Sequence, residues 1–161
     1  MIPALRLSNQ QGFTLAELMV VVAIVSVLAG VVFIHYVRQI PTSRLNGAAR
    51  HVLTDLMLAR RQAISRSQRV KVYFPEDQQN DKYYKICFDA NGDGTVADGE
   101  GNSRTTNIQA NYYGVTVSAN GDPVFQPSGT VSPTATITLT NARGTRQITM
   151  STVGRIHIKN E

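Results

Sequence analysis

A nearly uninterrupted apolar run constrains the fold of this chain more than any other feature of its sequence. Residues 18–36 read LMVVVAIVSVLAGVVFIHY and contain no Asp, Glu, Lys or Arg. At about 1.5 Å per residue, a helix of this length covers roughly the 30 Å hydrocarbon core of a bilayer. The run is longer than a signal-peptide core, and no small-x-small cleavage site follows it. The sequence therefore predicts a transmembrane helix segment over 13–37.

Composition limits what the remaining residues can form. The chain has 161 residues, of which 42% are hydrophobic and 17% are charged, a composition that excludes a disordered chain. A single cysteine excludes an intrachain disulfide framework, and with three histidines it leaves no ligand set for a structural zinc. Packing must therefore supply the stability of the domain that follows the apolar run.

A second helical pattern follows the apolar run and predicts an amphipathic helix over 38–70. Its apolar positions recur at steps of three and four residues, as one face of a helix requires. They are Leu45, Ala49, Val52, Leu56, Ala59 and Ala63. Pro41 predicts a kink or a brief break, because proline removes an interior hydrogen bond. Between 38 and 75 the sequence has eight basic residues and a single acid, Asp55. This excess of positive charge fits a solvated helix surface or attraction to acidic partners or phosphates.

Short β-type runs separated by Gly, Pro, Asn and Asp follow, and they predict a β-rich globular head over 71–161. The expected strands are 70–74, 83–88, 113–118, 123–126, 135–140, 146–150 and 155–159. Alternation of polar and apolar residues in ATITLT and RIHIK indicates strands with one buried face. The predicted fold class is α+β, with a long N-terminal helix packed on an antiparallel sheet.

The segment FDANGDGTVADGE has the spacing of an EF-hand calcium loop. With Asp89 as position one, oxygen-bearing residues fall at positions three, five, seven and twelve, and Gly94 falls at the sharp turn. The predicted calcium ligands are Asp89, Asn91, Asp93, Thr95 and Glu100. The flanking residues do not resemble paired EF-hand helices, so the alternative is an Asx-rich turn.

Catalytic chemistry finds no support in the sequence. Cys87 lies in an apolar strand pattern with no histidine near it in sequence, which indicates a buried small hydrophobe. Phosphate loops, nucleophile elbows and paired acid and base residues are missing from the sequence. We therefore expect that the chain is not an enzyme.

The string Gly12-Phe13-Thr14-Leu15-Ala16-Glu17 before the apolar run resembles the processing site of type IV prepilins and type II secretion pseudopilins. The resemblance implies that prepilin peptidase removes a leader over 1–12, cutting after Gly12, and methylates the new amino group of Phe13. It places the chain in the bacterial inner membrane as a single-pass protein with a periplasmic head, working with an inner-membrane assembly platform. Glu17 becomes the fifth residue of the mature chain. Its carboxylate would pair with the amino group of a neighbouring pilin in a filament, where a lone charge is costly.

A narrower resemblance spans most of the chain and points to the GspH/FimT family of minor pilins and pseudopilins. The family's Ala-Arg-x-x-Ala-Ile helix pattern matches residues 59–64, and its Phe-x-x-x-Gly turn matches residues 125–129. FimT-type members carry a Gly-Arg-x-Arg motif near the C-terminus that contacts DNA. Here the motif reads Gly154, Arg155, Ile156 and His157, so a histidine replaces the second arginine.

The resemblance leaves two functions open. The first is a FimT-like minor type IV pilin in pilus assembly and DNA uptake; the alternative is a GspH-type minor pseudopilin of a type II secretion system. The candidate DNA-binding residues are Arg143, Arg146, Arg155, His157 and Lys159. The alternative for Arg155 is an exposed strand residue without a ligand.

Overall fold

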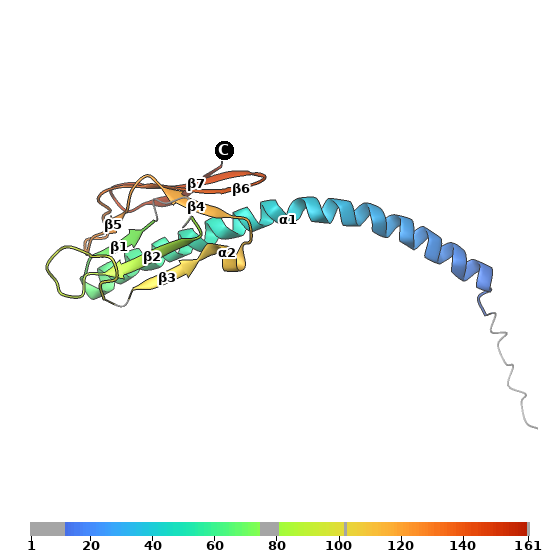
Figure 1. Ribbon diagram of the computed structural model, residues 1–161, viewed down its shortest axis with the longest axis horizontal. Helices are drawn as coiled ribbons and strands as arrows, with labels where there is room; N and C mark the ends of the chain where they lie inside the picture. Colours follow the sequence, from blue (N-terminus) through green and yellow to red (C-terminus); the bar gives the residue numbers. More distant parts are fainter. Residues whose placement is uncertain (1–11, 75–80, 102, 161) are drawn as a thin grey trace, which may run out of the picture. The chain divides into compact units, whose positions relative to one another are not determined.

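A computed structural model describes residues 12–74, 81–101 and 103–160 (Figure 1). One long helix, α1 (Leu15–Arg66), crosses the boundary between two compact units, Met1–Gln39 and Ile40–Glu161. The predicted break at Pro41 is wrong, because α1 continues through this proline.

The start of α1 follows from a capping sequence. Thr14 precedes the first helical residue, and its Oγ1 accepts a hydrogen bond of 3.2 Å from the backbone N–H of Glu17. This satisfies one of the four backbone donors that a helix N-terminus leaves without partners. Glu17 itself lies in the first turn, where a negative charge is favoured by the helix dipole.

The first unit presents its apolar side chains to the outside of the single chain. Phe13 is 84% exposed, and Leu28 in the middle of the run is 62% exposed. Among the described residues, no helix has both the length and the apolar character needed to cross a membrane. The transmembrane segment over 13–37 stays a prediction.

The helix ends four residues before the predicted 70. Ser67 has a positive φ of 51°, and the N–H of Gln68 donates to the carbonyl of Ala63 over 3.2 Å. A left-handed residue after the last turn is the common way to close a helix and release the chain. Strand β1 then begins at Val70.

The described residues of the head form two four-stranded sheets where one sheet was expected. The first has the order β3 (Arg104–Asn107), β2 (Tyr83–Phe88), β1 (Val70–Tyr73) and β5 (Val124–Phe125). The second has the order β4 (Thr116–Ala119), β6 (Thr136–Asn141), β7 (Gly144–Met150) and β8 (Ile156–Asn160). All of these strand pairs are antiparallel.

Two short elements were missed in the sequence. Strand β3 reads RTTN and has no buried residue, so it lacks the apolar alternation that reveals a half-buried strand. Helix α2 (Ile108–Asn111) follows directly and is capped by Asn107, whose Oδ1 accepts from the N–H of Ala110.

One hydrophobic cluster joins the second half of α1 to both sheets. All six apolar positions predicted on this half of the helix are buried, each at 2% exposure or less. They meet Val72 and Phe125 of the first sheet and Ile137 and Ile148 of the second. The helix is therefore the shared core element that positions the two sheets.

A buried polar network crosses this core. Asp55 of α1 is 5% exposed and accepts a hydrogen bond of 2.5 Å from the hydroxyl of Tyr84. His51 and Arg104 each approach the same carboxylate to 3.8 Å. Burial, and then the neighbouring Asp55 carboxylate, raises the pKa of Tyr84 well above its usual range. The network ties the helix to β2 and β3.

Candidate nucleic-acid interface

Strand β8 and the residue before it carry three of the five predicted DNA-binding residues on one face. Arg155, immediately before the strand, His157 and Lys159 alternate with Ile156 and Ile158. The three basic side chains are exposed, whereas the two isoleucines pack against the core. β8 is an edge strand, so its outer side has no neighbouring strand in this sheet. We call Arg155, His157 and Lys159 the β8 basic row.

Arg146 lies on the opposite face, contrary to its predicted place beside the other cations. On β7 it lies on the same face as the buried Ile148 and Met150, and its Nε donates over 3.0 Å to Oδ1 of Asn46 on α1. A strand turns successive side chains to opposite faces, and the position of Arg146 is the inner one. Sequence spacing alone could not show which face of β7 the helix covers.

The other predicted cations keep an outward position. Arg143 is exposed in the turn that joins β6 to β7. His157 pairs across the sheet with Thr149, and its Nε2 lies 2.9 Å from the threonine Oγ1. This contact orients the imidazole on the outer face of the sheet.

A hollow of about 320 Å³ between α1 and the start of β8 adds two arginines that were not predicted there. Arg60 and Arg61 of the helix line it together with Arg155 and the apolar Met57 and Ile64, and none of its lining residues is acidic. Sequence analysis placed the two helix arginines on a general basic face. Their meeting with Arg155 depends on the packing of β8 against α1.

The family-like motifs converge beside this hollow. Arg60 donates from Nε to the carbonyl of Gly129 over 2.8 Å and from Nη2 to the carbonyl of Val153 over 3.3 Å. Gly154 has φ +79°, and a Cβ there would lie 2.2 Å from the Gly129 carbonyl oxygen. The glycine is thus required for the close approach of two turns, and it sets the exposed Arg155 at the entrance of β8.

A similar hollow of about 340 Å³ is lined by residues of α1, β7 and β8. We call the two hollows together the groove. Arg50 and Arg146 line it with Asn46, Ala49 and Ile158. Arginines from the helix, from β7 and from the residue before β8 therefore line these two hollows. Guanidinium groups are well suited to phosphate oxygens because they donate in a planar fork.

The predicted calcium loop holds its acidic groups through its own backbone. Asp89 is buried and accepts from the N–H groups of Gly92 and Gly94 at 2.7 and 3.1 Å. Glu100 accepts from the backbone N–H groups of Ala90, Asn91 and Ala97.

Hydrogen bonds from the hydroxyl and the N–H of Thr95 lower the pKa of Asp93. Within the described part of the chain, no group of three or more His, Cys, Asp or Glu residues is placed to hold a metal ion. Calcium binding stays a prediction.

Cys87 is fully buried on β2, as its apolar surroundings predicted, and burial raises the pKa of its thiol. A raised pKa leaves less of the reactive thiolate.

The predicted processing residues Gly12, Phe13 and Glu17 are exposed at the start of the described chain. The rest of the predicted leader, residues 1–11, lies outside the described residues.

Comparison with family models identifies two matching regions. A model described as "Type II transport protein GspH" matches residues 48–154, more than half of the chain. A model described as "Prokaryotic N-terminal methylation motif" matches residues 7–33. The first region covers part of α1 and the head up to the residues before β8, and the second covers the processing-site string and most of the apolar run.

A curated relative matches a shorter region. Competence protein ComGD of Bacillus subtilis (strain 168) is 34% identical over 70 residues, which cover 44% of this chain and 49% of that protein. The chain therefore spans about half the length of this relative.

Two solved structures share the fold. The type IV minor pilin FimU of Pseudomonas aeruginosa has a TM-score of 0.56 at 21% identity, covering 74% of this chain and 90% of that one. The minor pseudopilin EpsH from the type 2 secretion system of Vibrio cholerae has a TM-score of 0.55 at 14% identity, covering 72% and 96%. The predicted α+β, pilin-like fold is confirmed.

Proposed function

Because this chain belongs to the family of type II transport protein GspH and carries the prokaryotic N-terminal methylation motif, we propose that it is a FimT-like minor type IV pilin. In this proposal it acts in pilus assembly and binds DNA during natural transformation. Its role is that of a structural and binding subunit, not an enzyme. The alternative is a GspH-type minor pseudopilin of a type II secretion system, and the two structural neighbours divide evenly between these machines.

The observation that carries DNA binding is the β8 basic row beside the arginine-lined hollow. Arg155, His157 and Lys159 point outward on an edge strand, and Arg60 and Arg61 of α1 lie beside Arg155. Cations that neutralise phosphates release condensed counterions and so supply sequence-independent affinity for DNA. The named relative ComGD is a competence protein, which also favours the pilus side of the choice.

The groove supports phosphate contacts rather than base recognition. Binding of unpaired bases generally uses aromatic side chains as stacking platforms. Among the described residues, neither arginine-lined hollow beside β8 is lined by an aromatic ring. The proposal therefore predicts DNA binding with a marked salt dependence and weak sequence preference.

The assembly part of the proposal rests on the first unit. Its exposed apolar side chains indicate contact with lipid or with other pilin helices, because a large exposed apolar surface marks a membrane or protein interaction site. We infer an inner-membrane anchor with a periplasmic head, leader removal by prepilin peptidase after Gly12, and assembly with other pilins. Glu17 would pair with the amino group that this cleavage creates on a neighbouring subunit.

A titration of double-stranded DNA into the full-length protein in detergent tests the DNA-binding function. The parent should bind, and its affinity should fall between low and moderate salt. Arg155→Ala should weaken binding about tenfold and reduce the salt slope by about one. Lys82→Ala removes an equal charge from an exposed turn outside the groove and should bind like the parent.

Two results would count against the DNA-binding function. Equal losses in Arg155→Ala and Lys82→Ala would show general attraction to a basic protein. No measurable binding by the parent at low salt would favour the pseudopilin alternative, which needs no nucleic-acid contact.

A further inference from the structure

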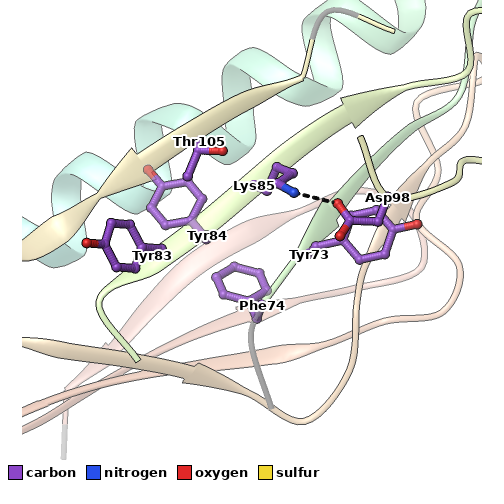
Figure 2. Close-up of a pocket in the computed structure, with 7 residues that line it drawn as sticks. All are labelled: Tyr73, Phe74, Tyr83, Tyr84, Lys85, Asp98 and Thr105. Atoms are coloured by element: carbon purple, nitrogen blue, oxygen red, sulfur yellow. Dashed lines mark hydrogen bonds and ion pairs between the residues drawn. The ribbon is translucent and has the colours of Figure 1, made fainter. Parts of the chain in front are cut away.

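A second concave site lies on the first sheet, away from the arginines of the second. It is a pocket of about 350 Å³ lined by residues of β1, β2 and β3 together with Phe74 and Asp98, shown in Figure 2. Its walls include four aromatic rings, those of Tyr73, Phe74, Tyr83 and Tyr84. This volume falls within the range of about 300–1,000 Å³ that small-molecule sites occupy. We call it the aromatic pocket.

The aromatic walls differ in accessibility and are held in place. Phe74 and Tyr84 form the inner wall, stacked with ring centroids 5.7 Å apart and almost completely buried. Tyr83 is 38% exposed and presents its ring to the opening. The ring of Tyr73 lies 4.1 Å from the ammonium of Lys71, and its hydroxyl donates to the carbonyl of Val96. The rings therefore form a preorganised apolar surface.

Polar groups stand beside these rings. Lys85 of β2 donates to Oδ1 of Asp98 over 2.7 Å, and a dashed line marks this contact in Figure 2. Thr105 of β3, which pairs with Lys85 in the sheet, adds a hydroxyl. Because Lys85 and Asp98 neutralise each other, an ionic ligand would have to break their pair to gain a partner. A neutral ligand with several hydroxyls can instead bridge both groups and keep them hydrogen-bonded.

These properties select a chemical class. A purely apolar ligand would cover the ion pair without satisfying it, which is costly. Nucleic acid is served better by the arginine-lined groove on β8. A sugar ring has an apolar C–H face that can lie on an aromatic ring and an edge of hydroxyls that can exchange hydrogen bonds. We propose that the aromatic pocket binds a neutral saccharide, with a sugar ring against Tyr83 and its hydroxyls on Lys85, Asp98 and Thr105.

Titration of neutral trisaccharides into the full-length protein tests this site. Maltotriose, cellotriose and N-acetylchitotriose serve as probes, followed by calorimetry and by saturation-transfer NMR. The detergent must lack a sugar headgroup, because an alkyl glycoside would compete. We expect saturable binding of at least one trisaccharide, and a loss of about tenfold in affinity for Tyr83→Ala, which is about 1.4 kcal/mol.

Matched variants keep the test independent of folding. Tyr113→Ala removes another exposed tyrosine, 76% exposed and outside the pocket, and should bind like the parent. Asp98→Ala leaves the rings in place and removes only the carboxylate, so it should also weaken binding. Circular dichroism and the denaturation midpoint establish that each variant is folded.

Three outcomes would overturn the proposal. One is no saturable binding of any of the three probes up to about 10 mM, the weak end of useful affinity. Another is unchanged affinity in folded Tyr83→Ala and Asp98→Ala. The third is binding only of an anionic heparin oligosaccharide that is lost in Arg155→Ala, which would assign the sugar to the basic groove. None of these results affects the test of DNA binding described above.

Discussion

The two halves of α1 are the same helix in two different situations. Over 15–37 the apolar side chains that the structure describes are exposed in the single chain, with Leu28 at 62%. Over 45–63 the apolar side chains keep to one face and are buried under two sheets, with Leu56 at 1%. The difference teaches that the first half needs a partner outside the chain, whereas the second half carries its partner within the same chain.

Glu17→Ala should produce the largest effect, a loss of incorporation into filaments through the first half of α1. If the carboxylate pairs with a cation in a filament, its loss leaves an unpaired buried charge on the neighbour, worth about 3–5 kcal/mol, or 100-fold or more in incorporation. Sedimented filaments, compared with total protein by immunoblot, measure this fraction. Stability of the head should not change, and normal incorporation of the variant would refute the pairing.

A matched pair of leucines separates the halves by stability. Leu56→Ala should lower the free energy of unfolding of the head by about 2–5 kcal/mol, because it leaves a cavity in the core. Leu28→Ala should change the same quantity by less than about 0.5 kcal/mol, because its side chain contributes nothing to that core. Urea denaturation followed by circular dichroism gives both values. Equal losses would show that the halves unfold as one cooperative unit.

Two glycines with the same φ test the junction that holds β8 against the helix. Gly154 and Gly114 both have φ +79°, but a Cβ added at Gly154 would meet other atoms within 4 Å, whereas a Cβ added at Gly114 would not. Gly114→Ala should cost about 1 kcal/mol from backbone strain, and Gly154→Ala about 3 kcal/mol because the clash adds to it. Thermal denaturation compares them. Equal effects would mean that the contact with Gly129 relaxes freely.

The buried hydrogen bond between Tyr84 and Asp55, which joins β2 to the second half of α1, predicts how the stability of the head changes at high pH. Folded Tyr84 keeps its proton above the ordinary pKa of 10.0, whereas the unfolded chain releases it. The unfolded state then binds fewer protons, so stability falls as pH rises above 10, by up to about 1.4 kcal/mol per pH unit. Tyr84→Phe should lose this part of the slope. Tyr113→Phe, at an exposed site, should keep it.

Calcium should give the smallest effect and should be confined to the head. If the loop over 89–100 binds the ion, a tenfold excess over Kd stabilises the folded head by about 1.4 kcal/mol. Asp89→Ala should abolish this gain, and magnesium serves as the comparison ion. Calorimetry that detects no heat for the parent would leave the segment an Asx-rich turn held by its own N–H groups.

Sequence reasoning succeeded where the signal is periodic. Leu45, Val52 and Leu56 are buried as their spacing predicted, and β2 has the predicted bounds. It failed where no periodic signal exists: β3 has no buried residue, and of the kink or brief break predicted at Pro41 the break is wrong. The single predicted sheet became two because strand runs do not reveal their partners, and pairing is set by contacts between residues distant in the chain.

The candidate site divides in the same way. Alternation along RIHIK was enough to place Arg155, His157 and Lys159 on one face. The inward position of Arg146 and the meeting of Arg60 with the Gly129 and Gly154 turns could not be read from spacing. These contacts join residues 69 to 100 positions apart.

The sequence by itself determined the apolar first helix, the amphipathic second half, the strand-rich head and the family. These properties depend on local composition and periodicity, which each segment carries without its partners. Only the tertiary structure decided which basic residues share a surface, which glycine lets two turns approach closely, and which aromatic rings line a pocket. These properties depend on the register and packing of two sheets around one helix, and packing brings together side chains that the sequence keeps apart.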